Sequence, residues 1–287
     1  MAEIVLLGTA QDGGVPHAGC LCEHCRRARG TAGYRRRPAC LGLRSGDEWA
    51  MIDATSAFAE QMLSLWERRD SSELDSRGRF PAPDALVLSH AHSGHYVGLW
   101  QLDRSVLASN QVPVYVDGSM GAFLRSQQIW SVMEGEGFLS ISPIEIGARF
   151  PILSEVQITP FEVPHRSEWP VKTLAYIIQG PRKRALYLPD IDGWEELSEP
   201  IENLTSGVDI AILDGCFWDA PPFPGVPHPP ISDTMGRLQA LVDSGSTEIV
   251  FTHLNHDNPA VDASSREARE INRRGFRVGF DGMSFSV

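Results

Sequence analysis

The sequence lacks a surplus of basic residues. Its 287 residues carry 25 Lys and Arg against 37 Asp and Glu, which gives a formal net charge of −12. Because a phosphate backbone is bound through basic surface, this balance argues against a nucleic-acid partner and favours a small-molecule substrate. The stretch 26–37 is locally rich in Arg. It is either a solvated basic loop or a docking patch for an anionic substrate or partner.

Long apolar runs are also missing. No run approaches the roughly 20 apolar residues that cross a bilayer. A secretory signal has a basic segment before a longer apolar run. The opening MAEIVLLGTAQDGG has no such basic segment, and its apolar run is short. We therefore expect a cytoplasmic protein that contacts no membrane. The sequence sets no oligomeric state, and a homodimer is compatible with it.

Cysteine is scarce, with five residues in the chain. In a reducing cytoplasm these thiols are not expected to form disulfides. Cys40 and Cys216 stand alone in apolar contexts, and we predict small buried side chains there. Cys20, Cys22 and Cys25 form a C-x-C-x₂-C cluster. Three thiolates at this spacing favour a zinc site that needs a fourth ligand, and a redox-active thiol cluster is the alternative.

The sequence does contain many short apolar segments. Strand-like segments are EIVLLG, EWAMIDAT, DALVLS, VPVYVD, VQITPFEVP, KTLAYIIQG, RALYLPD, VDIAILDG and EIVFTH. Helices are predicted near 56–69 and 119–133 and in SDTMGRLQALVDSG and SSREAREINRRG, and Asp281-Gly282 predicts a closing hairpin. Because strands outnumber helices, we predict an α+β protein, a four-layer αββα sandwich in one domain over residues 1–287. A doubly wound parallel sheet is the alternative.

Metal-capable side chains follow four of these predicted strands. The residues are His90, His92, His95, His165, Asp190 and His253. A single His or Asp at a strand end is usually an ordinary polar residue. Several together are different, because each buried imidazole needs a hydrogen-bond partner or a metal ion. Imidazole with carboxylate suits zinc, iron or manganese, so the pattern predicts a metal centre at one edge of the fold.

The segment HAHSGH with these later residues resembles the metallo-β-lactamase superfamily, whose signature is H-x-H-x-D-H followed by His, Asp and His at later strand ends. The opening LLGTAQDGGVPHAGCLCEHC and the closing FDGM are similar to the pyrroloquinoline-quinone biosynthesis protein B branch and to a related cyclic-phosphate phosphodiesterase. This resemblance extends over essentially the whole chain. It implies the αββα fold and a hydrolytic metal centre.

The resemblance also implies a ligand set. The ligands of the first metal position would be His90, His92 and His165. The ligands of the second would be His95, His253 and a bridging Asp190. Gly94 stands where the signature has Asp, so one anionic ligand is missing. We therefore expect a single tightly held Zn²⁺, Mn²⁺ or Fe²⁺ ion at the first position and a weak or empty second position, unless Asp192 or Glu168 fills the gap.

In the resembling phosphodiesterase, a His three positions after the last active-site His completes the structural zinc site. That residue is His256 here, and His24 inside the cysteine cluster is the alternative ligand. A His in a loop before a helix contacts phosphate or donates a proton in related enzymes. His228 in GVPHPPISD has that position, in a Pro-rich loop expected to be exposed. Its alternative interpretation is an ordinary surface histidine.

Three functions are consistent with these residues. The first is a metal-dependent hydrolase in which metal-activated water attacks a small phosphodiester, ester or lactone, with Asp190 and His228 as candidate catalytic residues. The second is an iron-dependent oxidative enzyme related to quinone-cofactor biosynthesis, although that branch departs from the full H-x-H motif that this chain retains. The third is a metal-binding protein without catalysis, in which Gly94 marks decay of the site.

Overall fold

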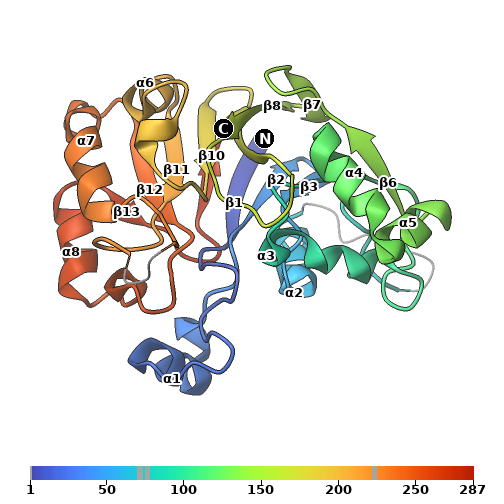
Figure 1. The fold of residues 1–287 in the computed structure, drawn as a ribbon, viewed down its shortest axis with the longest axis horizontal. Coiled ribbons are helices and arrows are strands. Elements are labelled where there is room, and N and C mark those ends of the chain that lie inside the picture. The colour runs from blue at the N-terminus through green and yellow to red at the C-terminus, as the bar shows by residue number, and fades with distance from the viewer. Residues whose placement is uncertain (1, 70–73, 75–77, 222–224) are drawn as a thin grey trace.

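The computed structural model describes residues 2–69, 74, 78–221 and 225–287, and its strands form two sheets of seven (Figure 1). The first sheet has the order β14-β1-β2-β3-β4-β5-β6. Its strands are β1 (Ala2–Gly8), β2 (Cys40–Ser45), β3 (Glu48–Ile52), β4 (Ala85–Val87), β5 (Val112–Val116), β6 (Leu139–Pro143) and β14 (Ser284–Ser286). The second sheet has the order β13-β12-β11-β10-β9-β8-β7. Its strands are β7 (Phe150–Leu153), β8 (Val156–Val163), β9 (Thr173–Gln179), β10 (Arg184–Leu188), β11 (Ile210–Asp214), β12 (Glu248–Thr252) and β13 (Arg277–Val278).

Helices cover the outer face of each sheet. The helices of the described residues are α1 (Glu23–Gly30), α2 (Phe58–Trp66), α3 (Ser93–Tyr96), α4 (Gly118–Ser126), α5 (Gln128–Gly135), α6 (Ile201–Ser206), α7 (Ile231–Ser244) and α8 (Arg266–Arg273). In Figure 1, α2, α4 and α5 flank the first sheet, α7 and α8 flank the second, and α1 projects from the body as a separate arm. The predicted αββα sandwich is confirmed.

Three buried apolar clusters fill the interfaces between the four layers. One joins the first sheet to α2, α4 and α5, a second lies between the sheets, and the third joins the second sheet to α7 and α8. Strand β1 shows why its sequence is continuously apolar. Val5 and Leu7 belong to the outer cluster, whereas Ile4 and Leu6 belong to the cluster between the sheets. Alternate side chains of one strand thus meet two apolar layers.

Strand direction determines where the loops gather. Because β1 and β3 are both antiparallel to β2, and β4 is parallel to β3, the carboxyl ends of β1, β3 and β4 lie at one edge of the first sheet. In the second sheet β8 and β10 are both antiparallel to β9, and β11 and β12 continue parallel to β10. Their carboxyl ends therefore also share an edge. The metal-capable residues follow strands of these two sets.

Two predictions of secondary structure are wrong. The helix expected near 119–133 is two helices, because Gln127 between α4 and α5 has an extended backbone. The hairpin expected at Asp281-Gly282 does not form, since β13 pairs with β12 in the second sheet and β14 pairs with β1 in the first. The Asp-Gly pair instead carries the chain from one sheet to the other, and Gly282 has a φ of 96° that favours glycine.

The Arg-rich stretch 26–37 is neither wholly solvated nor a uniform patch. Arg36 is half-buried and donates hydrogen bonds to the carbonyl oxygens of Gly279 and Val261. Arg37 forms an ion pair with Asp281 over 3.2 Å. These contacts fasten the base of the α1 arm to the end of the chain. Within the described ranges, none of the helices combines the length and apolar character needed to cross a membrane.

Candidate metal centre

The loops at the two sheet edges bring all six predicted active-site residues together. His90, His92 and His95 follow β4, and His165, Asp190 and His253 follow β8, β10 and β12. Strand ends far apart in the sequence thus supply one cluster, as expected for a site between two sheet edges. Two groups of four donor atoms, which share Asp190, together contain all six residues, and within each group all atoms lie within 4.8 Å of one another.

The first group contains His90, His92, His165 and Asp190. Nδ1 of His92 lies 3.0 Å from Nε2 of His90 and 3.1 Å from Nε2 of His165. Oδ2 of Asp190 lies 3.4 Å from His90 Nε2 and 3.3 Å from His165 Nε2. Ligand atoms about 2.0–2.2 Å from one zinc ion at tetrahedral angles are about 3.3–3.6 Å apart, so this group has the spacing of a metal site.

The second group contains His95, His253, Asp190 and Asp12. Asp190 Oδ2 lies 3.6 Å from His253 Nε2 and 4.0 Å from His95 Nε2, so one carboxylate oxygen stands between the two groups. Asp12 Oδ1 lies 3.1 Å from His95 Nε2 and 3.5 Å from His253 Nε2. The expectation that this position lacks a second carboxylate is therefore wrong, because Asp12 stands there.

The two residues suggested as replacements for the missing carboxylate lie elsewhere. Asp192 is on the outer side of His165, with its Oδ1 2.7 Å from His165 Nδ1. Glu168 lies 3.4 Å from Nε2 of His92, the ring nitrogen that faces away from the other ligands. Neither carboxylate belongs to the second group of donors.

Outer hydrogen bonds fix the histidine rings. Asp53 Oδ2 lies 2.7 Å from Nδ1 of His95, and Ser89 Oγ lies 2.9 Å from Nδ1 of His90. Asp192 holds His165 in the same way. Such partners leave the opposite ring nitrogen free to bind a metal ion and increase its basicity.

The backbone is strained at two of these positions. Asp53 has a φ of 72° and His253 a φ of 59°, in the region that residues other than glycine rarely occupy. Asp53 directly follows β3, and His253 directly follows β12. Strained residues persist where surrounding contacts over-determine them, and they concentrate at functional sites.

The charges of the cluster favour a cation. Asp53, Asp190 and Asp214 are buried. Burial would raise the pKa of Asp190, but the neighbouring histidines, first His253 and His165, hold it below its ordinary value. Burial and the neighbouring His95 lower the pKa of His90 well below its usual range, which leaves the neutral imidazole that binds metal.

Several buried polar atoms lack a partner among the described residues. They include Nε2 of His253, Oδ1 of Asp190 and Nε2 of His228. Buried groups of this kind are normally satisfied, so their concentration at the cluster calls for a ligand. Metal ions fit this requirement because the unpaired atoms are imidazole nitrogens and carboxylate oxygens.

His228 is buried, contrary to the expected exposed loop. Its Nδ1 lies 2.7 Å from Asp214 Oδ2 and 3.6 Å from Asp190 Oδ1. Burial would lower the pKa of His228, but the carboxylates of Asp214 and Asp190 outweigh it and raise the pKa to about 9. The ring thus lies beside the cluster with its Nε2 still unpaired.

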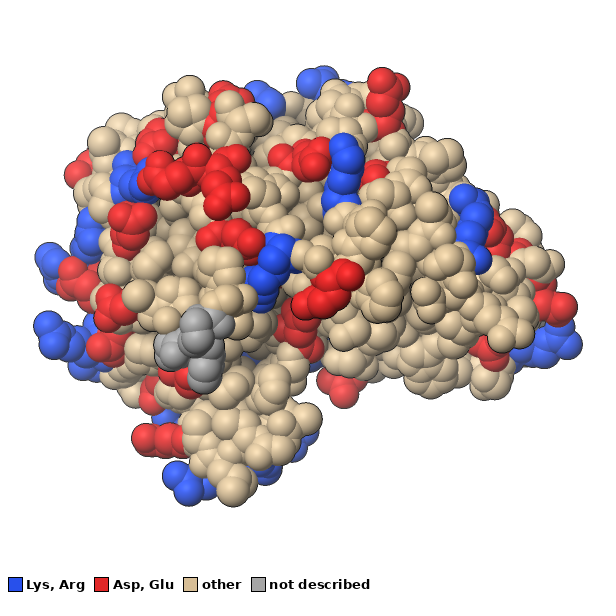
Figure 2. All heavy atoms as spheres, viewed as in Figure 1, with Lys and Arg blue, Asp and Glu red and all other residues tan. Residues whose placement is uncertain are grey.

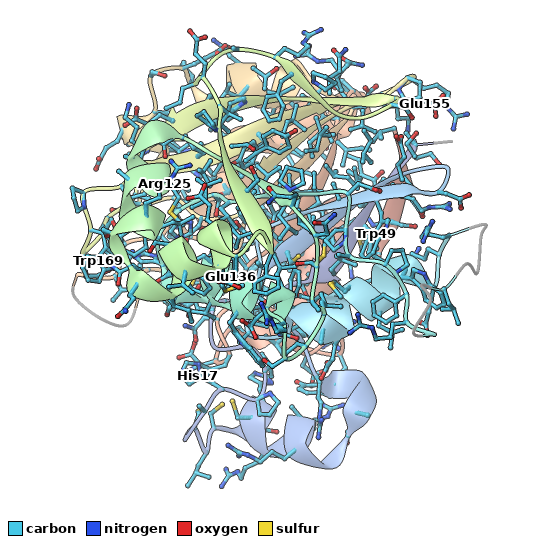
Figure 3. The ribbon with its side chains drawn as sticks, turned by 90° about the vertical axis from the view of Figure 1, so that its right-hand side faces the viewer. His17, Trp49, Arg125, Glu136, Glu155 and Trp169 are labelled. Carbon is cyan, nitrogen blue, oxygen red and sulfur yellow. The ribbon has the colours of Figure 1, made fainter. Side chains whose placement is uncertain are left out.

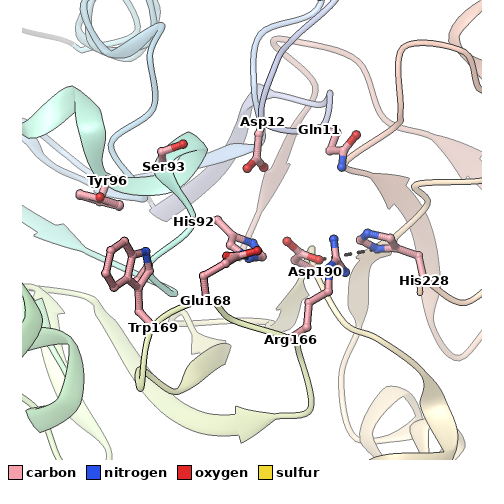
Figure 4. A pocket seen from close by; sticks show the side chains of 11 residues that line it. Gln11, Asp12, His92, Ser93, Tyr96, Arg166, Glu168, Trp169, Asp190 and His228 are labelled. Atoms are coloured by element: carbon pink, nitrogen blue, oxygen red, sulfur yellow. Dashed lines mark ion pairs between the residues drawn. The ribbon is translucent and has the colours of Figure 1, made fainter. Parts of the chain in front are cut away.

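A cavity of about 420 Å³ opens beside the cluster (Figure 4). Its lining residues are Gln11, Asp12, Ala91, His92, Ser93, Tyr96, Arg166, Glu168, Trp169, Asp190 and His228. Arg166 donates to Asp192 and stands on the same side as Glu168 and Trp169. The cavity therefore combines the Arg166 guanidinium, the aromatic side chain of Trp169 and the Asp190 carboxylate that both donor groups share.

Elsewhere on the face seen in Figure 2, acidic side chains gather over α6 and α7.

The cysteine cluster forms a separate donor site on the α1 arm. It consists of Cys20, Cys22, Cys25 and His256. Nδ1 of His256 lies 3.6 Å from Cys20 Sγ and 3.7 Å from Cys22 Sγ. The Cys22 and Cys25 amides donate to the sulfurs of Cys20 and Cys22. The alternative ligand His24 instead lies 2.6 Å from the Tyr34 hydroxyl.

His17 of the same arm contacts two of these four residues, His256 and Cys25. Its ring centroid lies 4.7 Å from that of His256, and its amide donates to Cys25 Sγ (Figure 3). The four donors of the predicted structural zinc site thus come from two segments far apart in the sequence. One segment follows β1, and the other follows β12 just after His253.

The sequence interpretation missed three acidic residues of the centre, Asp12, Asp53 and Asp214. Each follows or ends a strand whose carboxyl end lies at the same edge, β1, β3 and β11 respectively. The strand-end rule that selected the histidines would have selected them too.

The chain matches a family model and resembles curated proteins. The family model "Beta-lactamase superfamily domain" matches residues 48–254. Coenzyme PQQ synthesis protein B of Rhodopseudomonas palustris (strain BisB5) is 23% identical over 326 residues, covering 100% of both chains. The protein of that name from Rhizobium meliloti (strain 1021) is 25% identical over 308 residues, covering 98% of this chain and 96% of the relative.

Solved structures share the fold. Zn²⁺-bound PqqB from Methylobacterium extorquens has a TM-score of 0.82 at 21% identity, covering 99% of this chain and 100% of its own. A diphosphatase from the PhnP family has a TM-score of 0.70 at 20% identity, with 99% and 96% covered. The short form of human tRNase Z has a TM-score of 0.60 at 14% identity, with 99% of each chain covered.

Proposed function

Because this chain belongs to the β-lactamase superfamily, we propose that it is a metal-dependent hydrolase that cleaves a small anionic phosphodiester. The observation that carries the proposal is the position of Asp190. Its Oδ2 lies between two groups of imidazole donors, and its Oδ1 is buried without a hydrogen-bond partner among the described residues. A carboxylate placed in this way can hold two divalent ions and a reacting water at once.

The chain supplies the residues that such a centre requires. His90, His92 and His165 with Asp190 would hold one ion, and His95 and His253 lie on the other side of Asp190. Bound divalent ions would supply Lewis acidity that polarises a phosphoryl oxygen and activates water at neutral pH. Asp190 Oδ1 is placed to accept a hydrogen bond from that water and to orient its oxygen toward phosphorus.

His228 would serve the leaving group. Asp214 holds Nδ1, so Nε2 is the ring nitrogen that is left without a hydrogen-bond partner among the described residues, and His228 lines the cavity. When the P–O bond to the leaving group breaks, Nε2–H can give its proton to the departing oxygen. A positioned general acid contributes about 10²–10⁴-fold to such reactions.

The substrate class follows from the cavity wall. The Arg166 guanidinium lines the cavity and can pair with a phosphate oxygen. Trp169 is 47% exposed, and its ring lies 5.3 Å from that of Phe123. This aromatic surface can pack against the organic part of a substrate. A small organic phosphodiester meets both requirements, and an ester or lactone with an acidic substituent is the nearest alternative.

The test is hydrolysis of bis(p-nitrophenyl) phosphate and p-nitrophenyl acetate by protein whose metal content has been measured. We expect phosphodiester turnover that a chelator abolishes and that Zn²⁺ or Mn²⁺ restores. If fully metal-loaded protein hydrolyses neither substrate, the proposal is contradicted.

A second candidate is an iron-dependent oxidative enzyme of quinone-cofactor synthesis. It is favoured by the full-length relatives named coenzyme PQQ synthesis protein B, which confirm the resemblance to that branch. A site of imidazoles and one carboxylate also suits iron and O₂. Protein purified anaerobically would then contain iron at the centre and consume O₂ with a tyrosine-derived substrate, with no phosphodiester turnover.

A further inference from the structure

Gly94 and Asp12 compete for one volume. A Cβ added to Gly94 would lie 2.4 Å from Cγ of Asp12, 2.5 Å from its Cβ and 2.8 Å from its Cα. Contacts this short do not occur between non-bonded carbon atoms. The space in which a side chain at position 94 would begin is therefore already occupied by a carboxylate from the loop after β1.

The Asp12 carboxylate also points to the correct partners. Its Oδ1 lies 3.1 Å from Nε2 of His95 and 3.5 Å from Nε2 of His253, close to the ligand separations of a tetrahedral zinc site. Nε2 of His253 is buried and has no hydrogen-bond partner among the described residues. An ion between these atoms and Asp190 would satisfy that nitrogen.

The Asp12 loop is fastened to the segment that carries His253. The Gln11 amide donates to the Leu254 carbonyl, and the Leu254 amide donates to the Thr9 carbonyl, both over 2.9 Å. The Asn255 side chain donates to Gln11 Oε1 over 2.6 Å. These bonds join the residues next to Asp12 to the residues next to His253. They therefore hold the two side chains at a fixed distance.

We propose that Asp12 is the anionic ligand of the second metal position and replaces, from a different segment, the carboxylate that Gly94 lacks. The second position would then contain two imidazoles and two carboxylates, the same chemistry as the complete signature. Gly94 is small because Asp12 occupies its space. This inference rests on the proposed metal centre, and it replaces the expectation of a weak or empty second position.

The test is the metal content of a set of variants, measured by mass spectrometry after equilibration in buffered Zn²⁺. Asp12→Asn and Asp12→Ala should each hold one ion fewer per chain than the parent. Gly94→Asp alone should also lose an ion, because the new side chain displaces Asp12. The double variant Asp12→Gly/Gly94→Asp should regain the parent stoichiometry, because it moves the carboxylate to the position in the signature.

Asp243→Ala is the matched control, since Asp243 is an exposed carboxylate on α7. It should retain every ion, and circular dichroism should show that each variant is folded. Full ion content in Asp12→Asn, or failure of the folded double variant to regain the ion, would overturn the role of Asp12. A parent that binds no ion beyond the cysteine site would instead overturn the proposed metal centre itself. Substitution with Co²⁺ provides a second readout, because the visible spectrum of the second position should vanish in Asp12→Asn.

Discussion

Oδ2 of Asp214 lies 2.7 Å from Nδ1 of His228, and both side chains are buried beside the metal cluster. This contact engages Nδ1 and leaves Nε2 as the ring nitrogen without a hydrogen-bond partner among the described residues. It also turns a histidine from a Pro-rich loop into a group with a defined orientation. The chemistry assigned to His228 depends on this pair as much as on the histidine alone.

Replacing His228 by Ala should lower kcat in a way that depends on the leaving group. We expect a loss of about 100-fold for an alkyl phosphodiester, whose leaving oxygen needs a proton. The loss should be less than about 10-fold for bis(p-nitrophenyl) phosphate, whose leaving group departs as an anion. Steady-state kinetics with both substrates measure this difference, and equal losses would show that His228 does not act as an acid.

Replacing Asp214 by Asn should shift the pH profile of kcat. Asp214 raises the pKa of His228, so its removal lowers that pKa. Because the acid acts in its protonated form, the decline of the rate on the basic side should move to lower pH. A purely structural role would reduce the rate at every pH without moving this limb.

Replacing Arg166 by Ala should raise KM for a phosphodiester by about 10-fold or more, since hydrogen bonds to charged groups contribute about 1.5–3 kcal/mol. KM for a neutral ester should change little, and Arg166→Lys should restore part of the loss. If the two substrates are affected equally, Arg166 acts on the structure of the cavity and does not recognise the anion.

Replacing Cys22 by Ser should weaken two sites at once. The cysteine site joins the chain after Asp12 to the chain after His253. Loss of its ion should lower Tm by roughly 5–10 °C, as a loss of a few kcal/mol does in a protein of this size. The second active-site ion should be held more weakly than the first.

Thermal melting and metal titration measure both effects. His24→Ala is the matched control, because His24 contacts Tyr34 and is outside the four donors of the cysteine site. If a Cys22→Ser variant has lost the ion of the cysteine site but keeps both active-site metal ions, the two sites are independent.

The sequence by itself determined much of this molecule. Short, continuously apolar segments such as β1 predicted strands buried on both faces, and from these followed the layered sandwich. Histidines at strand ends predicted a metal centre. The resemblance to the superfamily implied which residues would hold the first ion and that His253 and His256 would serve different sites. The strands and the metal centre could be predicted because strand period and the order of residues along a strand are local properties of the chain.

Only the tertiary structure decided how Gly94 should be interpreted. In sequence, a glycine in place of a carboxylate indicates a missing ligand. In three dimensions, Asp12 reaches the same point from the loop after β1, although the two residues are far apart along the chain. Likewise, only the tertiary structure decides that His228 is buried and paired with Asp214. A binding site is defined by the convergence of atoms in space, and which segment supplies each atom is decided only when the sheets pack together.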